Sequence, residues 1–217
     1  MLFKSEKSKM ITADRALKGR ETAMSISGRH TITGNSMVAP YPEGYEIAMF
    51  GLGCFWGAER KFWTLPGVHT TAVGYSAGYT PNPTYREVCS GSTGHNEVVL
   101  VAFNSRIIGY NTLLKIFWEA HNPTQGMRQG NDQGTQYRSG IYTFGEKQFT
   151  LAKQSKDLFQ DALSDQAIGI ITTEIQAAKE FYFAEEYHQQ YLDKNPNGYC
   201  GLDGCGIELE MLSSLVD

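Results

Sequence analysis

The chain has 217 residues and a net charge of −4 at pH 7, from 19 lysines and arginines against 23 aspartates and glutamates. This length fits one large domain, and no linker or repeat divides it. The acidic balance argues against a nucleic-acid-binding surface, and no apolar run approaches the roughly 18 residues that a membrane span needs. We therefore expect neither a nucleic-acid nor a membrane partner, and we expect a monomer.

The first 45 residues are polar, rich in Ser, Thr, Gly and Lys, with only scattered apolar side chains. This composition predicts an extension, residues 1–45, that drapes over the domain and is partly ordered at best. Met1-Leu2-Phe3 runs straight into charged residues, so the segment lacks the apolar centre of a signal peptide. The sequence therefore predicts a cytoplasmic protein.

A strand and a helix meet at Cys54. Residues 46–50 are mostly apolar and predict a short buried strand, and apolar residues from Phe55 to Leu65 recur at helical spacing. A cysteine at a helix N-terminus meets unpaired N–H groups, which lower the thiol pKa below roughly 8.5 and favour the nucleophilic thiolate. The pattern thus predicts a reactive Cys54, with Phe55 and Trp56 beside it as the wall of an apolar pocket.

The next elements alternate between strands and irregular segments. Residues 68–75 and 97–103 predict strands, and the latter is the clearest strand in the sequence. Between them, residues 76–95 predict a long loop with glycines, prolines and two tyrosines, and loops of this length are usually functional. Residues 111–121 predict an amphipathic helix, capped near Ser105 or Asn111.

The second half begins with another polar irregular segment, residues 122–138. A strand over 139–144, a long helix over 146–163 and a strand over 170–175 follow. The last predicted helix lies within 181–193, before an Asn-Pro-Asn-Gly turn and a glycine-rich tail.

These elements predict an α+β fold, a two-layer sandwich of helices on a mixed β-sheet with long irregular terminal segments. We expect the extension at 1–45, a catalytic domain at 46–195 and a mobile C-terminal tail at 196–217.

The four cysteines, Cys54, Cys89, Cys200 and Cys205, fit neither a disulfide-rich scaffold nor a zinc site, because the single close pair has no second pair to complete four ligands. We expect Cys89 to pack as a small apolar residue. The glycine-rich loops lack phosphate-binding spacings. The sequence therefore predicts no metal and no cofactor.

Both irregular segments place a tyrosine near an ionisable group: Tyr85 with Glu97, and Tyr137 with Asp132. Together with Cys54, these residues are compatible with several hypotheses about function. One alternative is a cysteine hydrolase or acyltransferase in which Cys54 pairs with His95 or His188. A non-catalytic alternative is a module that binds apolar or oxidised peptides through Phe55 and Trp56.

The stretch Gly53-Cys54-Phe55-Trp56-Gly57-Ala58-Glu59 resembles the signature of the class A peptide methionine sulfoxide reductases. Further segments resemble the same family in the right order, over about residues 45 to 200. They are Gly74-Tyr75, Gly78-Tyr79, Asn82-Pro83-Thr84-Tyr85, Cys89-Ser90-Gly91, Thr93-Gly94-His95-Asn96-Glu97, Gln129-Gly130-Asn131-Asp132, Gly134-Thr135-Gln136-Tyr137-Arg138-Ser139 and Tyr187-His188-Gln189-Gln190-Tyr191-Leu192.

The resemblance implies a repair enzyme for the S epimer of methionine sulfoxide, free or in proteins. It implies that Cys54 attacks the sulfoxide sulfur and becomes a sulfenic acid. It implies that a protonated carboxyl and two hydroxyls donate protons or hydrogen bonds to the sulfoxide oxygen. The matching residues here are Glu97, Tyr85 and Tyr137. The residues that the resemblance assigns to substrate binding are Phe55, Trp56, Asp132 and His188.

The tail carries the remaining chemistry that the resemblance implies. Cys200 matches the resolving cysteine, which forms a disulfide with Cys54 and separates a reductase from a hydrolase. Cys205 is the candidate to pass that disulfide to thioredoxin. The spacing after Cys200 is shorter than the family pattern, so Cys205 is either a recycling cysteine or a spectator on an exposed turn.

Overall fold

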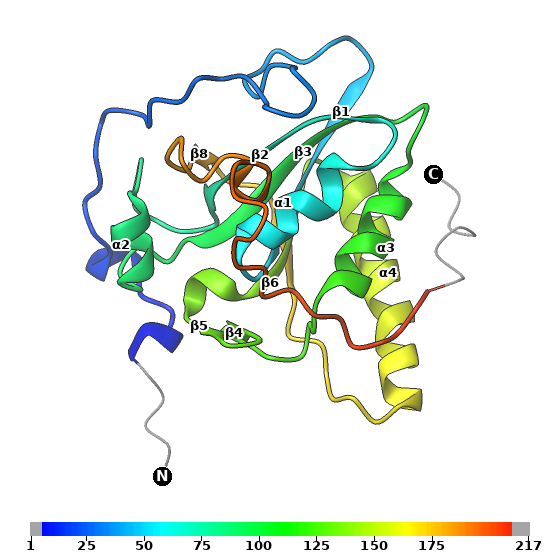
Figure 1. Cartoon of the computed structure of the whole chain (residues 1–217). Coiled ribbons are helices and arrows are strands. Elements are labelled where there is room, and N and C mark those ends of the chain that lie inside the picture. The colour runs from blue at the N-terminus through cyan, green and yellow to red at the C-terminus, as the bar shows by residue number, and fades with distance from the viewer. Residues whose placement is uncertain (1–5, 210–217) are drawn as a thin grey trace.

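The computed structural model describes residues 6–209, and its centre is a six-stranded mixed sheet (Figure 1). In spatial order the strands are β7 (Glu174–Ala177), β6 (Ser139–Thr143), β1 (Tyr45–Leu52), β3 (Asn96–Asn104), β2 (Val68–Ser76) and β8 (Tyr182–Phe183). The β6–β7 pair is parallel, and the other neighbouring pairs are antiparallel. The helices are α1 (Phe55–Trp63), α2 (Tyr85–Cys89), α3 (Tyr110–Ala120), α4 (Glu146–Asp165) and α5 (Tyr191–Lys194).

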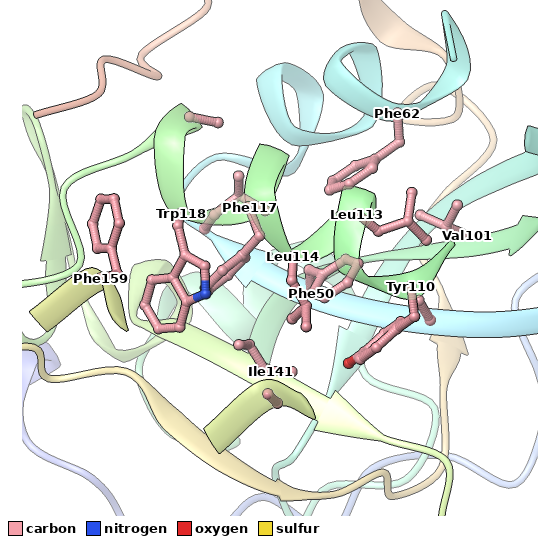
Figure 2. Packing of buried hydrophobic residues seen from close by; sticks show 14 of the residues in the cluster. Phe50, Phe62, Val101, Tyr110, Leu113, Leu114, Phe117, Trp118, Ile141 and Phe159 are labelled. Carbon is pink, nitrogen blue, oxygen red and sulfur yellow. The ribbon is translucent and has the colours of Figure 1, made fainter. Parts of the chain in front are cut away.

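Alternation along the central strands produces the layers. In β1, Phe50 and Leu52 face the helices, whereas Met49 belongs to a separate cluster on the opposite face. Because side chains on a strand alternate between faces, the apolar run of β1 supplies both sides of the sheet. Figure 2 shows the helix-side core, where Phe50 stacks on Phe62 of α1. The ring centres of Phe50 and Phe117 of α3 lie 5.5 Å apart. The predicted α+β sandwich of helices on a mixed sheet is confirmed.

Two predicted elements differ from the structure. The predicted loop 76–95 contains α2, which begins with a capping box in which Thr84 and Glu87 exchange side-chain to backbone hydrogen bonds. The predicted helix 181–193 is wrong: β8 and turns occupy most of it, and only its last residues, 191–193, belong to the short helix α5. The backbone of Gln190 is left-handed, with φ of 47°, which is incompatible with a continuous helix.

Other boundaries also differ. The strand predicted at 170–175 begins only at Glu174, and the exposed Ile170 lies outside it. Helix α3 begins after Gly109 rather than with a Ser105 or Asn111 cap. A small hairpin of β4 (Arg128–Gln129) and β5 (Asp132–Gln133) lies inside the segment predicted as irregular.

The N-terminal segment runs along the outside of the sheet domain (blue in Figure 1). The backbone N–H of Leu17 donates a hydrogen bond to the Ser92 carbonyl, and His30 is buried with Nε2 2.9 Å from the Thr71 hydroxyl. Within residues 6–209, no helix combines the length and the hydropathy required to cross a membrane.

Candidate active site

The turn between β1 and α1 places Cys54 at the N-cap of α1, as the sequence predicts. Gly53 precedes it with φ of 98°, and a Cβ there would lie 2.6 Å from Cγ of Gln129, so only glycine fits this turn. Phe50 of β1 pairs with Val99 of β3. Because the pair is antiparallel, Glu97 of β3 comes level with the end of β1 and the start of α1.

A cavity of about 90 Å³ opens at this junction. The residues that line it are Cys54, Phe55, Trp56, Tyr85, Glu97, Asp132, Tyr137 and Tyr199. All of them except Tyr199 were predicted from the sequence. The signal for Tyr199 is its place directly before Cys200, since the tail that brings the cysteine to the cavity also brings its neighbour.

Glu97 is a buried carboxyl at the base of the site. Its side chain is 1% exposed, and Oε2 accepts a hydrogen bond of 3.1 Å from the backbone N–H of Phe55. Burial raises the pKa of Glu97 to about 8, against the opposing effect of that N–H. The raised pKa favours the protonated form of Glu97 at pH 7.

The Cys54 thiol is also buried. Burial raises its pKa above the ordinary value, and the charge of ionised Glu97 raises it further, whereas the N–H groups of Trp56 and Gly57 lower it. The predicted lowering of the Cys54 pKa is wrong because desolvation outweighs the helix terminus. The contribution of Glu97 disappears when its carboxyl is neutral, so a protonated Glu97 also favours formation of the thiolate.

Tyr85 begins α2 and Tyr137 ends the 3₁₀ turn Thr135–Tyr137. Burial raises the pKa of both hydroxyls, and the charge of Glu97 raises each further. Both groups are therefore hydrogen-bond donors at neutral pH. Cys89 lies one helical turn after Tyr85 and is half-buried. The expectation that Cys89 packs as a small apolar residue stays a prediction.

Two predicted histidines are not among the described residues that line the cavity. His188 lies behind the wall, where Nδ1 accepts a hydrogen bond of 2.9 Å from Nε1 of Trp56. His95 lies 2.7 Å from the Thr80 carbonyl through Nε2 and accepts from the N–H of Gly78 through Nδ1. A general base must be within hydrogen-bond reach of its proton, so this geometry disfavours the cysteine–histidine hydrolase.

The C-terminal tail crosses the first turn of α1 (red in Figure 1). A Cβ on Gly57 would lie 3.0 Å from Sγ of Cys200 and 2.9 Å from Cγ of Leu202. The Tyr199 hydroxyl donates a hydrogen bond of 3.2 Å to Oδ2 of Asp132. The tail therefore brings Cys200 against the helix that begins at Cys54.

Cys205 lies farther along, half-buried beside the C-terminal end of α3. Its Sγ is 3.8 Å from the carbonyl oxygen of His121, and Ile207 and Leu209 pack into the core after it. All four cysteines lie in the described part of the chain and are free. In residues 6–209, no group of three or more side chains is arranged to hold a metal ion.

Comparisons with known proteins agree with this geometry. The family model described as peptide methionine sulfoxide reductase matches residues 46–210. A peptide methionine sulfoxide reductase of Synechocystis is 62% identical over 202 residues, covering 93% of this chain and 91% of the relative. The mitochondrial enzyme of Bos taurus is 55% identical over 199 residues, covering 92% and 85%.

A solved structure gives the same result. The fold superposes on methionine sulfoxide reductase A of Corynebacterium diphtheriae with a TM-score of 0.83 at 43% identity, covering 93% of this chain and all of that one. The chain therefore belongs to the peptide methionine sulfoxide reductase A family, and it is an oxidoreductase that reduces methionine sulfoxide with thiols.

Proposed function

We propose that the cavity at the N-terminus of α1 is the catalytic site, with Cys54 as nucleophile and Glu97 as proton donor. One observation carries this assignment: a thiol, a buried carboxyl whose pKa is raised and two tyrosine hydroxyls line the same small cavity. Nucleophile, acid and oxygen-binding donors are the groups that sulfoxide reduction requires. The S epimer of methionine sulfoxide, free or in proteins, is the proposed substrate.

The proposed step moves the oxygen from the substrate to the enzyme. The Cys54 sulfur attacks the sulfoxide sulfur, while Glu97 protonates the sulfoxide oxygen and the hydroxyls of Tyr85 and Tyr137 donate hydrogen bonds to it. The attack forms a bond between the two sulfurs. The protonated oxygen then moves as a hydroxyl group from the substrate sulfur to the Cys54 sulfur as the sulfur–sulfur bond breaks, so that methionine leaves and Cys54 becomes a sulfenic acid. The proton that the Cys54 thiol loses restores Glu97. The thiol is oxidised by two electrons and the sulfoxide is reduced by two.

The remaining wall fits the substrate side chain. Phe55 and Trp56 supply apolar surface for its methyl group. Asp132, which binds Tyr199 at the mouth, is placed for polar contact with the substrate backbone or with water. His188 contributes to substrate binding through Trp56, whose indole N–H donates a hydrogen bond to its Nδ1.

Cys200 is the proposed resolving thiol, since the tail holds it against the first turn of α1. It condenses with the sulfenic acid of Cys54 to form a disulfide and water. Cys205 then attacks the Cys54–Cys200 disulfide, and thioredoxin reduces the new disulfide that this exchange forms. The position of Cys205 beside His121 means that this second step requires movement of the tail.

The proposal also covers the domain organisation, the oligomeric state and the location of the protein. We keep a catalytic domain at 46–195, an extension at 1–45 and a moving tail at 196–217, of which residues 210–217 lie outside the described part. A monomer suffices, because one chain supplies the whole cavity lining. The cytoplasm suits the cycle, because thiols return to the reduced form in a reducing compartment.

The test is a reaction without reductant. Reduced protein is mixed with the S epimer of methionine sulfoxide, and the methionine formed and the thiols lost are counted for each chain. The proposal predicts that two thiols disappear with the first methionine. A hydrolase would form no methionine, and a binding module would retain the sulfoxide unchanged; either result would contradict the proposal.

A further inference from the structure

Residues 184–190 form a segment behind the cavity, and none of them is among the described residues that line it. Gln189 fixes this segment to β2: its side-chain oxygen accepts from the Val73 N–H at 3.0 Å, and its side-chain nitrogen donates to the Val73 carbonyl at 2.9 Å. Gln190 donates to the buried carboxyl of Glu59 through its backbone and its side chain. Held at both contacts, the segment is a rigid base for the side chains between them.

Glu185 extends from this base to the start of α2. Its Oε1 accepts a hydrogen bond of 2.8 Å from the backbone N–H of Tyr85. Its Oε2 accepts a hydrogen bond of 3.0 Å from the hydroxyl of Tyr75 in β2. A bond from an N–H to a charged carboxylate is among the stronger hydrogen bonds in proteins. Glu185 therefore ties the first residue of α2 to the sheet, at the point where Tyr85 enters the cavity.

His188 extends from the same base to Trp56. Because Nδ1 accepts a hydrogen bond from the indole N–H of Trp56, the neutral imidazole ring of His188 carries its own proton on Nε2. That Nε2 lies 3.9 Å from Oε2 of Glu185 and has no hydrogen-bond partner among residues 6–209. The ring also packs 5.0 Å from Phe55 and 4.6 Å from Tyr85, centre to centre. His188 thus sets the indole plane from behind and contacts two further rings of the wall.

We propose that Glu185 and His188 are positioning residues for sulfoxide reduction, Glu185 acting through Tyr85 and His188 acting through Trp56. The inference rests on the proposed function of the cavity. Neither side chain is among the described residues that line it, so neither touches the reacting atoms. Displacement of a reacting or binding group by about 1 Å can cost about 100-fold in rate, so distant anchors of this kind control catalysis.

The test of Glu185 compares two neighbouring carboxylates. Loss of a hydrogen bond to a charged group predicts that Glu185→Ala slows single-turnover methionine formation by about tenfold or more. Glu185→Gln keeps an oxygen for the Tyr85 N–H and should retain a rate within about threefold of native. The matched control is Glu186→Ala, since Glu186 bonds Ser27 and Lys194 on the outer side and should leave the rate unchanged.

The test of His188 compares two side chains of similar size. His188→Asn places an oxygen near the Nδ1 position and keeps an acceptor for the Trp56 indole, whereas His188→Leu removes it. We expect His188→Leu to raise KM about fivefold with a smaller effect on kcat, and His188→Asn to restore KM. The Trp56 indole N–H resonance, assigned with Trp56→Phe, should move upfield in His188→Leu and stay close to native in His188→Asn.

The outcomes distinguish a failure of the proposed function from a failure of the positioning role. Native protein that forms no methionine would refute the proposed function, whereas the indole resonance tests positioning without any turnover. Native-like kinetics in folded Glu185→Ala and His188→Leu would overturn the inference. Equal KM defects in His188→Leu and His188→Asn, with a native-like indole resonance in the latter, would also overturn it, because His188 would then contact substrate directly. If Glu185→Ala does not fold, Glu185→Asp, which withdraws the carboxylate by one methylene, is held to the same expected loss.

Discussion

The backbone N–H of Phe55, the residue directly after the proposed nucleophile Cys54, donates a hydrogen bond of 3.1 Å to Oε2 of Glu97. This bond joins the first turn of α1 to β3 and sets the acid beside the thiol. It occupies one oxygen of Glu97, which leaves the other for the proton that the sulfoxide oxygen receives. One backbone contact therefore links the proposed acid, Glu97, to the residue that follows the proposed nucleophile, Cys54.

Glu97→Gln should separate proton transfer from binding. The amide still accepts the Phe55 N–H and still donates a hydrogen bond, but it delivers no proton. We expect single-turnover methionine formation to slow by a factor on the order of 10²–10⁴, with substrate affinity close to native. Rapid-quench measurements over a range of substrate concentrations give both quantities. A native rate in this variant would place the acid elsewhere.

The rate of sulfoxide reduction should fall as the pH rises through about 8. Glu97 with a pKa of about 8 is protonated below this pH and is an anion above it. The anion no longer donates a proton, and its charge raises the pKa of Cys54. Single-turnover rates from pH 6 to 10 should show this decline in native protein and lose it in Glu97→Gln. An identical decline in both proteins would assign it to another group.

Stability should respond to the same group. The folded pKa of Glu97 lies above its ordinary value of 4.5, so between about pH 4.5 and 8 the folded chain holds a proton that the unfolded chain has lost. Stability therefore falls as the pH rises through this window, and the contribution of Glu97 is constant above it. In urea unfolding, the stability of native protein relative to Glu97→Gln should decrease from pH 4.5 to 8. A constant difference would mean that the pKa of Glu97 is not raised by folding.

Gly57→Ala should impair resolution while sparing the first step. The new methyl group would lie 3.0 Å from Sγ of Cys200 and 2.9 Å from Cγ of Leu202, so the tail must move away. We expect methionine release at the native rate, disulfide formation slowed by roughly tenfold, and accumulation of sulfenic acid on Cys54. Trapping with dimedone and mass spectrometry measures the sulfenic acid. Disulfide formation at the native rate would show that contact with Gly57 does not direct Cys200.

The two tail cysteines should fail at different steps. Cys200→Ser should stop with sulfenic acid on Cys54, whereas Cys205→Ser should release one methionine per chain and form the Cys54–Cys200 disulfide. Turnover of Cys205→Ser should fall with thioredoxin and fall less with a small dithiol, because exchange depends on access to a particular sulfur. Peptide mapping of oxidised native protein decides between relay and spectator. A Cys54–Cys200 disulfide with Cys205 free after repeated turnover would rule out the relay.

Strong local patterns in the sequence predicted the strand, turn and helix around Cys54 and the strand that carries Glu97. The helix predicted over residues 181–193 is wrong because tertiary contacts determine the conformation of this segment. Buried Gln189 and Gln190 form hydrogen bonds with β2 and α1, and sequence periodicity does not reveal those partners. In contrast, the Thr84–Glu87 capping box was present in the sequence and predicts α2 directly.

The candidate site shows the same division. Motif resemblance located the residues that line the cavity, apart from Tyr199. The raised pKa of Cys54 and the place of His188 behind Trp56 depend on burial and on packing between distant elements. Neither follows from residue spacing, because both are set by what surrounds the side chain.

The most direct test of the account is a single turnover of Cys54→Ser beside native protein, each reduced and then mixed with the S epimer of methionine sulfoxide without reductant. A serine hydroxyl is too weak a nucleophile to replace the thiol in this site. The account predicts a burst of about one methionine or more per chain from native protein and none from Cys54→Ser, with native-like circular dichroism in both. Methionine formation by folded Cys54→Ser would contradict the central assignment.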